Sequence, residues 1–204
     1  MVDAATLRRA LGLIDAANAQ DPNTVRAGAV EGPRELVLSR LVSAWVSRLD
    51  EDPAPELVLA ARGHHLRRWE HPRSAYPAGR GGYLRWRTAL YTIHAGHISA
   101  LLETAGVEPA AVARVAALVA KRVPRTEPDA QALEDALCLA FLEADLAPVA
   151  GRMDDTTMVR VLRKTWAKMS GPAHTLALGL ITDDGQRTLV ERALAAAPGQ
   201  DSSG

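Results

Sequence analysis

The stretch DAQALEDALCLAFLEADLA, residues 129–147, decides the fold class of this chain. Between Leu133 and Leu142 it is apolar on nearly every side, which is typical of a helix at the centre of a helical domain. Asp135 interrupts the pattern, because it shares a helical face with Cys138. A buried carboxylate is costly unless it is paired, hydrogen-bonded or bound to a metal. Asp135 therefore indicates either a structural ion pair or a functional site.

The rest of the chain has the same helical character. Alanine and leucine, which favour helices, abound, and no run alternates in the manner of a strand. Proline and glycine build a loop at residues 71–82. We predict an all-α, single-domain helical bundle over residues 1–197, with C-terminal helices at 155–197 and a disordered tail at 198–204. The helices are expected at residues 3–18, 34–49, 56–70, 83–105, 108–121, 128–147, 155–169, 172–181 and 186–197.

The composition excludes several classes of protein. Of 204 residues, 48% are hydrophobic and 24% are charged, which is the ordinary globular mixture and excludes a mainly disordered chain. No apolar stretch approaches the roughly 18 residues that cross a bilayer, and the N-terminus lacks an apolar signal core. We therefore expect a soluble, cytoplasmic protein that does not contact a membrane. One cysteine, Cys138, excludes an internal disulfide and a cysteine-built zinc cluster.

The charges balance overall but gather locally. The chain has 24 basic and 24 acidic side chains, which argues against a nucleic-acid binder that works by bulk electrostatics. Residues 62–87 hold seven arginines and one acid, Glu70, and therefore carry a charge of +6. Four large aromatic side chains are interleaved with these arginines. Such a segment is suited to an anionic ligand with a planar ring or to single-stranded nucleic acid, although a solvated face is the simpler interpretation.

Four histidines occupy two of the expected helices. His64 and His65 follow an apolar helical run, and His94 and His97 lie three residues apart on the helix expected at 83–105. A single inward histidine is more often a satisfied core residue than a ligand. Four histidines together with an inward aspartate indicate a metal or proton-transfer site, because imidazole binds metals and carries protons near neutral pH.

The order of these elements resembles the HD superfamily of helical metal-dependent hydrolases over roughly residues 35–146. VLAARGHHL, residues 58–66, stands where that family has its His-Asp doublet, and Asp135 falls at the position of its final aspartate. The chain departs from the family pattern in having His-His at the doublet. It also lacks the first family histidine, for which Glu35 is the nearest ligand-type residue. The resemblance implies a divalent metal (Zn, Mn or Fe) held by Glu35, His64, His65, His94 and Asp135.

A closer resemblance is to an uncharacterised bacterial and fungal family of unknown function, whose members are sometimes mislabelled as glutamyl-tRNA synthetases. The matching stretches are AARGHHLRRWEHPRSAYPAGRGGYLRWR (60–87), LEDALCLAFLE (133–143) and TWAKMS (165–170). This resemblance implies no reaction. It does imply a set of typical residues, namely Glu35, His65, Arg68, Trp69, Arg73, Tyr83, Trp86, Arg87, His94, Lys121, Glu134, Asp135 and Lys168.

These observations favour a metal-dependent enzyme acting on an anionic small molecule, most simply by phosphoester hydrolysis. The expected catalytic side chains are Glu134, Asp135 and Lys121. The expected substrate-binding side chains are Arg68, Trp69, Arg73, Tyr83, Trp86, Arg87 and Lys168. We expect Arg73 and Asp135 to share one pocket. The alternatives are an iron-dependent oxygenase on the same scaffold and an RNA- or tRNA-associated binding module.

Overall fold

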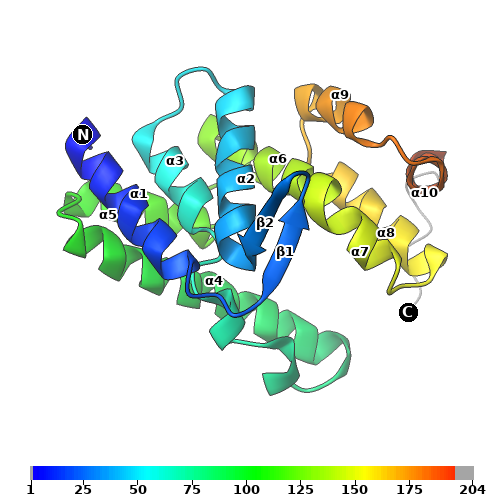
Figure 1. Ribbon diagram of the computed structural model, residues 1–204, viewed down its shortest axis with the longest axis horizontal. Coiled ribbons are helices and arrows are strands. Elements are labelled where there is room, and N and C mark those ends of the chain that lie inside the picture. The colour runs from blue at the N-terminus through cyan, green and yellow to red at the C-terminus, as the bar shows by residue number, and fades with distance from the viewer. Residues whose placement is uncertain (1, 196–204) are drawn as a thin grey trace.

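Figure 1 shows the computed structural model, which describes residues 2–195 and is an all-α single domain with one small hairpin. The expected tail at 198–204 and the end of the last expected helix lie outside the described residues. The predicted all-α class is confirmed. The helices are α1 (Ala4–Asn18), α2 (Arg34–Leu49), α3 (Pro55–Gly63), α4 (Gly79–Thr104), α5 (Pro109–Val119), α6 (Pro128–Ala140), α7 (Leu146–Ala150), α8 (Asp155–Trp166), α9 (Gly171–Leu180) and α10 (Asp184–Ala195).

The helix ends follow from local chemistry. Asp3 accepts hydrogen bonds from the backbone N–H groups of Ala5 and Thr6 at 2.9 Å and so caps α1. Asp154 caps α8 in the same way, and Ser170 caps α9. Prolines open α3, α5 and α6, where a missing N–H costs no helical hydrogen bond.

The core lies between α2, α3, α4, α5 and α6. Helix α2 packs against α3 and α6, and α5 packs against α3 and α4 (Figure 1). Trp45, Leu59, Ile98, Val115 and Leu139 come from these five helices and are at most 1% exposed. The expectation of a central helix at 129–147 is therefore confirmed. That stretch is divided into α6, a π-helical turn η3 (Phe141–Asp145) and α7. Within residues 2–195, no helix has both the length and the apolarity needed to cross a membrane.

A hairpin that the sequence analysis did not expect precedes α2. Strands β1 (Thr24–Ala27) and β2 (Val30–Pro33) pair antiparallel, with Thr24 opposite Pro33. Gly28 begins the two-residue turn with a φ of 58°, a conformation that glycine adopts without strain. The expectation that no run of the chain forms a strand is wrong here, because strands of four residues carry too little alternation to be recognised. Asp21 joins the hairpin region to α2 by accepting a hydrogen bond from the backbone N–H of Glu35 at 3.0 Å.

The segment between α3 and α4 also differs from the expectation. Helix α3 ends at Gly63 rather than at residue 70, and Arg67 has a left-handed backbone with a φ of 56°. Two short 3₁₀ turns follow, η1 (Arg68–Glu70) and η2 (Arg73–Ala75). Helix α4 then begins at Gly79, four residues before the expected start. The early ending places His65 in a turn rather than at the end of a helix.

Candidate functional site

A cavity of about 320 Å³ lies among α2, the α3–α4 segment, α4, the end of α5, α6, η3 and the end of α8. Its lining residues therefore come from positions 34 to 168 of the chain. The π-helical turn contributes Phe141 and Asp145. Such turns are frequent at functional sites, because the extra residue re-aims neighbouring side chains.

One wall of the cavity holds Glu35, His64, His65 and His94. The Nδ1 atoms of His64 and His94 lie within hydrogen-bond distance of the carbonyls of Ala61 (2.8 Å) and Leu66 (3.0 Å). A carbonyl can only accept, so each Nδ1 carries the proton and each Nε2 has a free lone pair. The ring centroids of His65 and His94 are 5.5 Å apart, and those of His64 and His65 are 4.1 Å apart. Three imidazoles therefore gather beside one carboxylate.

Two polar atoms on this wall have no hydrogen-bond partner among the described residues. They are Oε2 of Glu35 and Nε2 of His94, and both are buried. Nδ1 of His65 lies 3.7 Å from Oε2 of Glu35, which is too long for a hydrogen bond. Leaving a buried polar atom unpaired costs about 1–3 kcal/mol. Such a cost is tolerated where a ligand, ion or water satisfies the atom.

Burial determines the protonation states on this wall. It lowers the pKa of His64 to about 3 and that of His94 to about 4. It also lowers the pKa of His65 well below the ordinary value, and the nearby Arg68 guanidinium adds to that shift. Burial raises the pKa of Glu35, although His64 and Arg68 oppose the rise. The histidines are therefore neutral at pH 7, which is the form that accepts a proton or binds a metal.

Cations line the rest of the cavity. They are Arg34, Arg68, Arg87, Lys121 and Lys168, and they face the three carboxylates Glu35, Glu134 and Asp145. With neutral histidines, five cations against three carboxylates leave the cavity with a net charge of +2. Arg34 forms an ion pair with Asp145 at 2.8 Å. The excess positive charge favours an anionic occupant.

Lys121, Glu134 and Lys168 form an ion-pair cluster between two cavities. Nζ of Lys121 donates to Oε2 of Glu134, and Nζ of Lys168 lies 3.4 Å from Oε1. Burial alone would raise the pKa of Glu134, but the two ammonium groups outweigh it, so the pKa lies below the ordinary value. A second cavity of about 310 Å³ shares this cluster and Arg87 with the first. Glu134 therefore stays charged and holds both lysines at the boundary.

Lys121 has an unusual backbone. It follows α5 with a φ of 53°, a left-handed conformation that glycine usually supplies at the end of a helix. A lysine there costs about 1–2 kcal/mol.

Aromatic side chains complete the cavity. Tyr83, Trp86 and Tyr91 come from α4, and Phe141 comes from η3. The Arg68 guanidinium lies 4.9 Å from the centre of the Trp86 ring, and Nε of Arg87 donates to the Tyr91 hydroxyl at 2.7 Å. Arg68 and Arg87 are thus held in place by aromatic neighbours.

Most of the predicted site residues meet at this cavity. The residues brought together are Glu35, His64, His65, Arg68, Tyr83, Trp86, Arg87, His94, Lys121, Glu134 and Lys168. Sequence reasoning missed Arg34, Tyr91, Phe141, Asp145 and Thr165. The π-helical turn that presents Phe141 and Asp145 carries no recognisable signal in the sequence.

Three predicted residues lie outside the lining of both cavities, so the expected pocket shared by Arg73 and Asp135 is wrong. Oδ1 of Asp135 accepts hydrogen bonds from Nε2 of Gln131 (2.9 Å) and from the backbone N–H of Ser170 (2.8 Å). Adjacent helical residues differ by about 100° in direction, so Glu134 reaches the cavity and Asp135 does not. Arg73 donates to the carbonyls of Tyr76, Pro77 and Gly79, which holds the α3–α4 segment together. Trp69 lies in η1 away from the lining.

The fold and the cavity define an all-α domain with a buried histidine and carboxylate wall and a cationic, aromatic rim. A family model matches residues 8–190, and the chain belongs to that family, Domain of unknown function (DUF4202). The comparison with curated proteins found no match to this chain, and neither did the comparison with solved structures. The likeness to the HD superfamily stays a prediction.

Proposed function

We propose that the chain is a metal-dependent enzyme that acts on an anionic, phosphate-bearing small molecule in the main cavity, by phosphoester hydrolysis. The observation that carries the proposal is the pair of buried, unpaired atoms, Oε2 of Glu35 and Nε2 of His94, beside a cavity with a net charge of +2. Unpaired acceptors require a cation or a donor, and the surrounding cations require an anion. A metal ion together with a phosphate would satisfy both.

Glu35, His65 and His94 would hold the metal. Two imidazoles and one carboxylate are a donor set found at catalytic zinc sites. Nδ1 of His94 is held by the Leu66 carbonyl, which leaves Nε2 free as a ligand. In this structure the three ligand atoms are not all within 4.8 Å of one another, so a side-chain rotation must accompany binding. When bound, a divalent metal supplies a water of lowered pKa and polarises a phosphoryl oxygen.

The cationic side chains would bind and orient the substrate. Arg68 and Arg87 present planar guanidinium groups that match phosphate oxygens, and both are positioned by aromatic rings. Lys121 and Lys168 keep a fixed position because Glu134 pairs with both. Tyr83 and Trp86 offer ring faces for a planar group on the substrate. This arrangement supports a nucleotide-like substrate as one form of the phosphate ester.

Metal analysis tests the first half of the proposal. Wild-type protein purified without chelator is expected to retain, or to take up, one equivalent of divalent metal in the cavity. Glu35→Gln and His65→Ala should lose it. His174→Ala is a matched control, because His174 lies outside the cavity and contacts the Trp166 carbonyl. Wild-type protein that binds no stoichiometric metal when metal is supplied would contradict the proposal.

Phosphate binding tests the second half. Calorimetric titration with inorganic phosphate should show binding to the wild type that weakens about 10- to 150-fold in Arg68→Met, the loss of a charged hydrogen bond of about 1.5–3 kcal/mol. Arg40→Met is the matched control, since Arg40 pairs with Asp15 outside the cavity. Hydrolysis of p-nitrophenyl phosphate should depend on the metal and on Arg68. Equal phosphate affinity in both variants would count against an anion site here.

A second candidate is an iron-dependent oxygenase. Two histidines and one carboxylate are also the donor set of non-haem iron oxygenases, so the same wall supports that reaction class. Metal identity discriminates the two functions. Iron together with oxygen consumption favours the oxygenase, whereas zinc or manganese together with phosphatase activity favours the hydrolase.

The RNA-binding alternative rests on the +6 charge of residues 62–87. In the structure, Arg62, Arg68 and Arg73 from this segment contact Asp15, His65 and backbone carbonyls respectively. This internal pairing favours a structural and substrate-binding role over a nucleic-acid surface. A salt-dependent shift with single-stranded RNA that persists in Arg68→Met would instead favour the RNA-binding module.

A further inference from the structure

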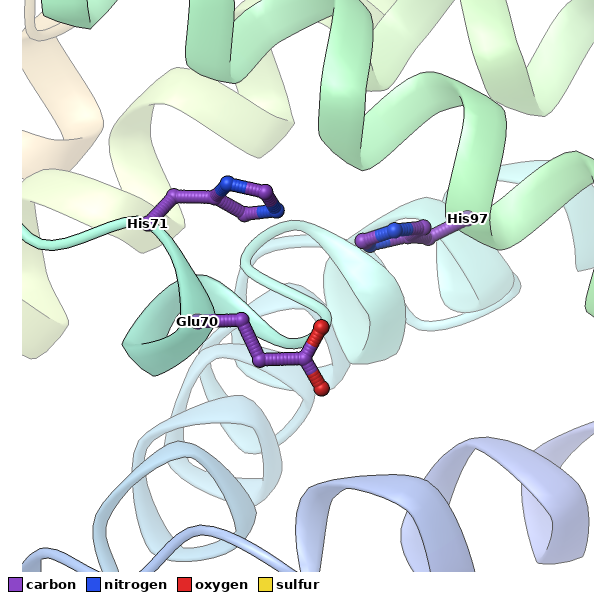
Figure 2. Close-up of side chains that lie close together, drawn as sticks. All are labelled: Glu70, His71 and His97. Carbon is purple, nitrogen blue, oxygen red and sulfur yellow. The ribbon is translucent and has the colours of Figure 1, made fainter.

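A second cluster of metal-binding side chains lies outside the main cavity. Glu70, His71 and His97 each bring one ligand atom within 4.8 Å of the others, and among the described residues this is the one such group. Figure 2 shows the three side chains converging, with the His71 ring pointing toward the His97 ring and the Glu70 carboxylate beside them. None of the three lines the main cavity.

The backbone around this cluster is held in place. Glu70 is the last residue of η1, and His71 follows it directly. The N–H of His71 donates to the Arg68 carbonyl at 3.1 Å, and Nε1 of Trp86 donates to the His71 carbonyl at 2.9 Å. His97 comes from α4. The cluster therefore joins the α3–α4 segment to a helix of the core.

Both histidines have a nitrogen available for a ligand. Nε2 of His71 is buried and has no hydrogen-bond partner among the residues described. Nδ1 of His97 lies 3.3 Å from the Leu66 carbonyl, which orients the ring and leaves its Nε2 with a lone pair. The two ring centroids are 5.9 Å apart. An unpaired buried nitrogen facing a second imidazole is the arrangement that an ion between them would satisfy.

Glu70 is not committed to another partner. Its nearest cation is Nε of Arg67 at 3.9 Å, and the two side chains are 43% and 46% exposed. An exposed pair at that distance contributes little to stability. The carboxylate is therefore free to bind an ion without breaking a strong contact.

We propose that Glu70, His71 and His97 form a binding site for a divalent transition metal, with Zn²⁺ as the best match. Two imidazoles, one carboxylate and an exposed fourth position for water are typical of zinc. A metal here ties the α3–α4 segment, which carries His65 and Arg68, to α4. This site shares no ligand with the metal proposed in the main cavity and does not depend on it. Because the Leu66 carbonyl holds both His94 and His97, the two sites are structurally adjacent.

Titration of metal-free full-length protein with Zn²⁺, and with Co²⁺ followed by its visible absorption, tests the proposal. Removing a group that hydrogen-bonds to a metal ligand already weakens metal binding about 10- to 100-fold, and removing the ligand itself should weaken it more. We therefore expect His71→Ala, His97→Ala and Glu70→Gln each to weaken one binding event by at least about 100-fold. His65→Ala and the distant His174→Ala should leave this event unchanged. Thermal unfolding of each metal-free variant verifies that it is folded.

Limited trypsin digestion supplies a second readout, since Arg67 and Arg73 flank the site. Zn²⁺ should slow cleavage at these arginines in the wild type and in His65→Ala, but not in His97→Ala. A metal equivalent lost only in the Glu70, His71 and His97 variants supports this site, whatever happens in the cavity. The proposal is overturned if His71→Ala and His97→Ala bind metal with the wild-type stoichiometry and affinity.

Discussion

At the scale of single residues, Lys121 has a left-handed backbone that is unfavourable for a lysine, but its side chain has a role in the candidate site. The backbone N–H of Arg122 donates to the Ala117 carbonyl at 2.9 Å, which closes the end of α5 around a left-handed residue. Glycine would adopt this conformation without strain. The lysine instead supplies an ammonium group that pairs with Glu134 at the boundary of the two cavities. The strain is confined to the backbone of Lys121, and it is tolerated because the side chain forms the ion pair with Glu134.

Two substitutions at Lys121 separate these effects. Lys121→Gly and Lys121→Met both remove the ammonium group, but only glycine relieves the backbone. We expect Lys121→Gly to be more stable to urea than Lys121→Met by about 1–2 kcal/mol, the cost of a left-handed residue with a side chain. Both variants should bind phosphate more weakly than the wild type. Equal stability of the two variants would show that the backbone at this position is not strained.

Asp135 makes structural hydrogen bonds, whereas the resemblance to the HD superfamily implied that it is a metal ligand. It is 3% exposed, and Oδ1 accepts hydrogen bonds from Gln131 and from the backbone of Ser170. We expect Asp135→Ala to lower the free energy of unfolding by about 1–3 kcal/mol, because two partly buried donors lose their acceptor. Metal content should not change. Loss of metal in Asp135→Ala, with Glu35→Gln as the comparison, would instead restore Asp135 as a ligand.

At the scale of elements, the start of α4 depends on a close approach at Gly82. A Cβ at Gly82 would lie 1.7 Å from the Pro77 carbonyl oxygen, whereas a Cβ at Gly81 would meet nothing within 4 Å. The glycines of this segment are thus not equivalent. Only Gly82 allows the α3–α4 segment to pack onto the helix that presents Tyr83 and Trp86.

Alanine at each glycine tests this packing. Gly82→Ala should destabilise the protein and weaken phosphate binding, because the segment must move away from α4. Gly81→Ala should keep phosphate affinity and raise stability by up to about 1 kcal/mol, since alanine favours a helix. Urea unfolding and phosphate titration of both variants measure these effects. A neutral Gly82→Ala would show that the segment can shift without affecting the site.

At the scale of the whole molecule, burying neutral histidines makes global stability depend on pH. Burial lowers the pKa of His64 to about 3 and that of His94 to about 4, whereas an unfolded histidine titrates near 6.5. Between pH 6.5 and 4 the unfolded chain therefore binds protons that the folded chain does not. Stability falls as pH falls through this window, by about 1.4 kcal/mol per pH unit for each histidine. Glu35 opposes this trend above pH 4.5, because burial raises its pKa and the folded chain therefore binds a proton there more readily than the unfolded chain. The two histidines outweigh this single carboxyl group.

Urea unfolding between pH 7.5 and 5, with chelator present, measures this dependence. The free energy of unfolding of the wild type should fall as pH falls. The slope for His64→Gln should be smaller by up to about 1.4 kcal/mol per pH unit, the contribution of one histidine. Arg68 lies near the same wall, but an arginine keeps its charge across this range, so it does not contribute to the slope. An identical slope in wild type and His64→Gln would show that His64 is not buried in the neutral form.

The amino-acid sequence by itself determined the helical class, the central helix at 129–147 and a set of site residues, most of which line the cavity. These features follow from local causes: helical periodicity, proline and glycine at element ends, and charged or imidazole groups next to apolar runs. His64, His65, Arg68 and His94 were recognised in this way, Glu35 was implied by the family resemblance, and all five line one cavity.

Only the tertiary structure decided which face of each helix turned toward the cavity. Glu134 and Asp135 are adjacent in sequence, yet one lines the cavity and the other binds the backbone of Ser170. The approach of Glu70 and His71 to His97 likewise depends on the left-handed turn at Arg67 and on the packing against α4. Periodicity constrains a residue to a helix face, but the neighbour that covers this face comes from distant parts of the chain. The contacts of these side chains therefore belong to the packing and not to the local sequence.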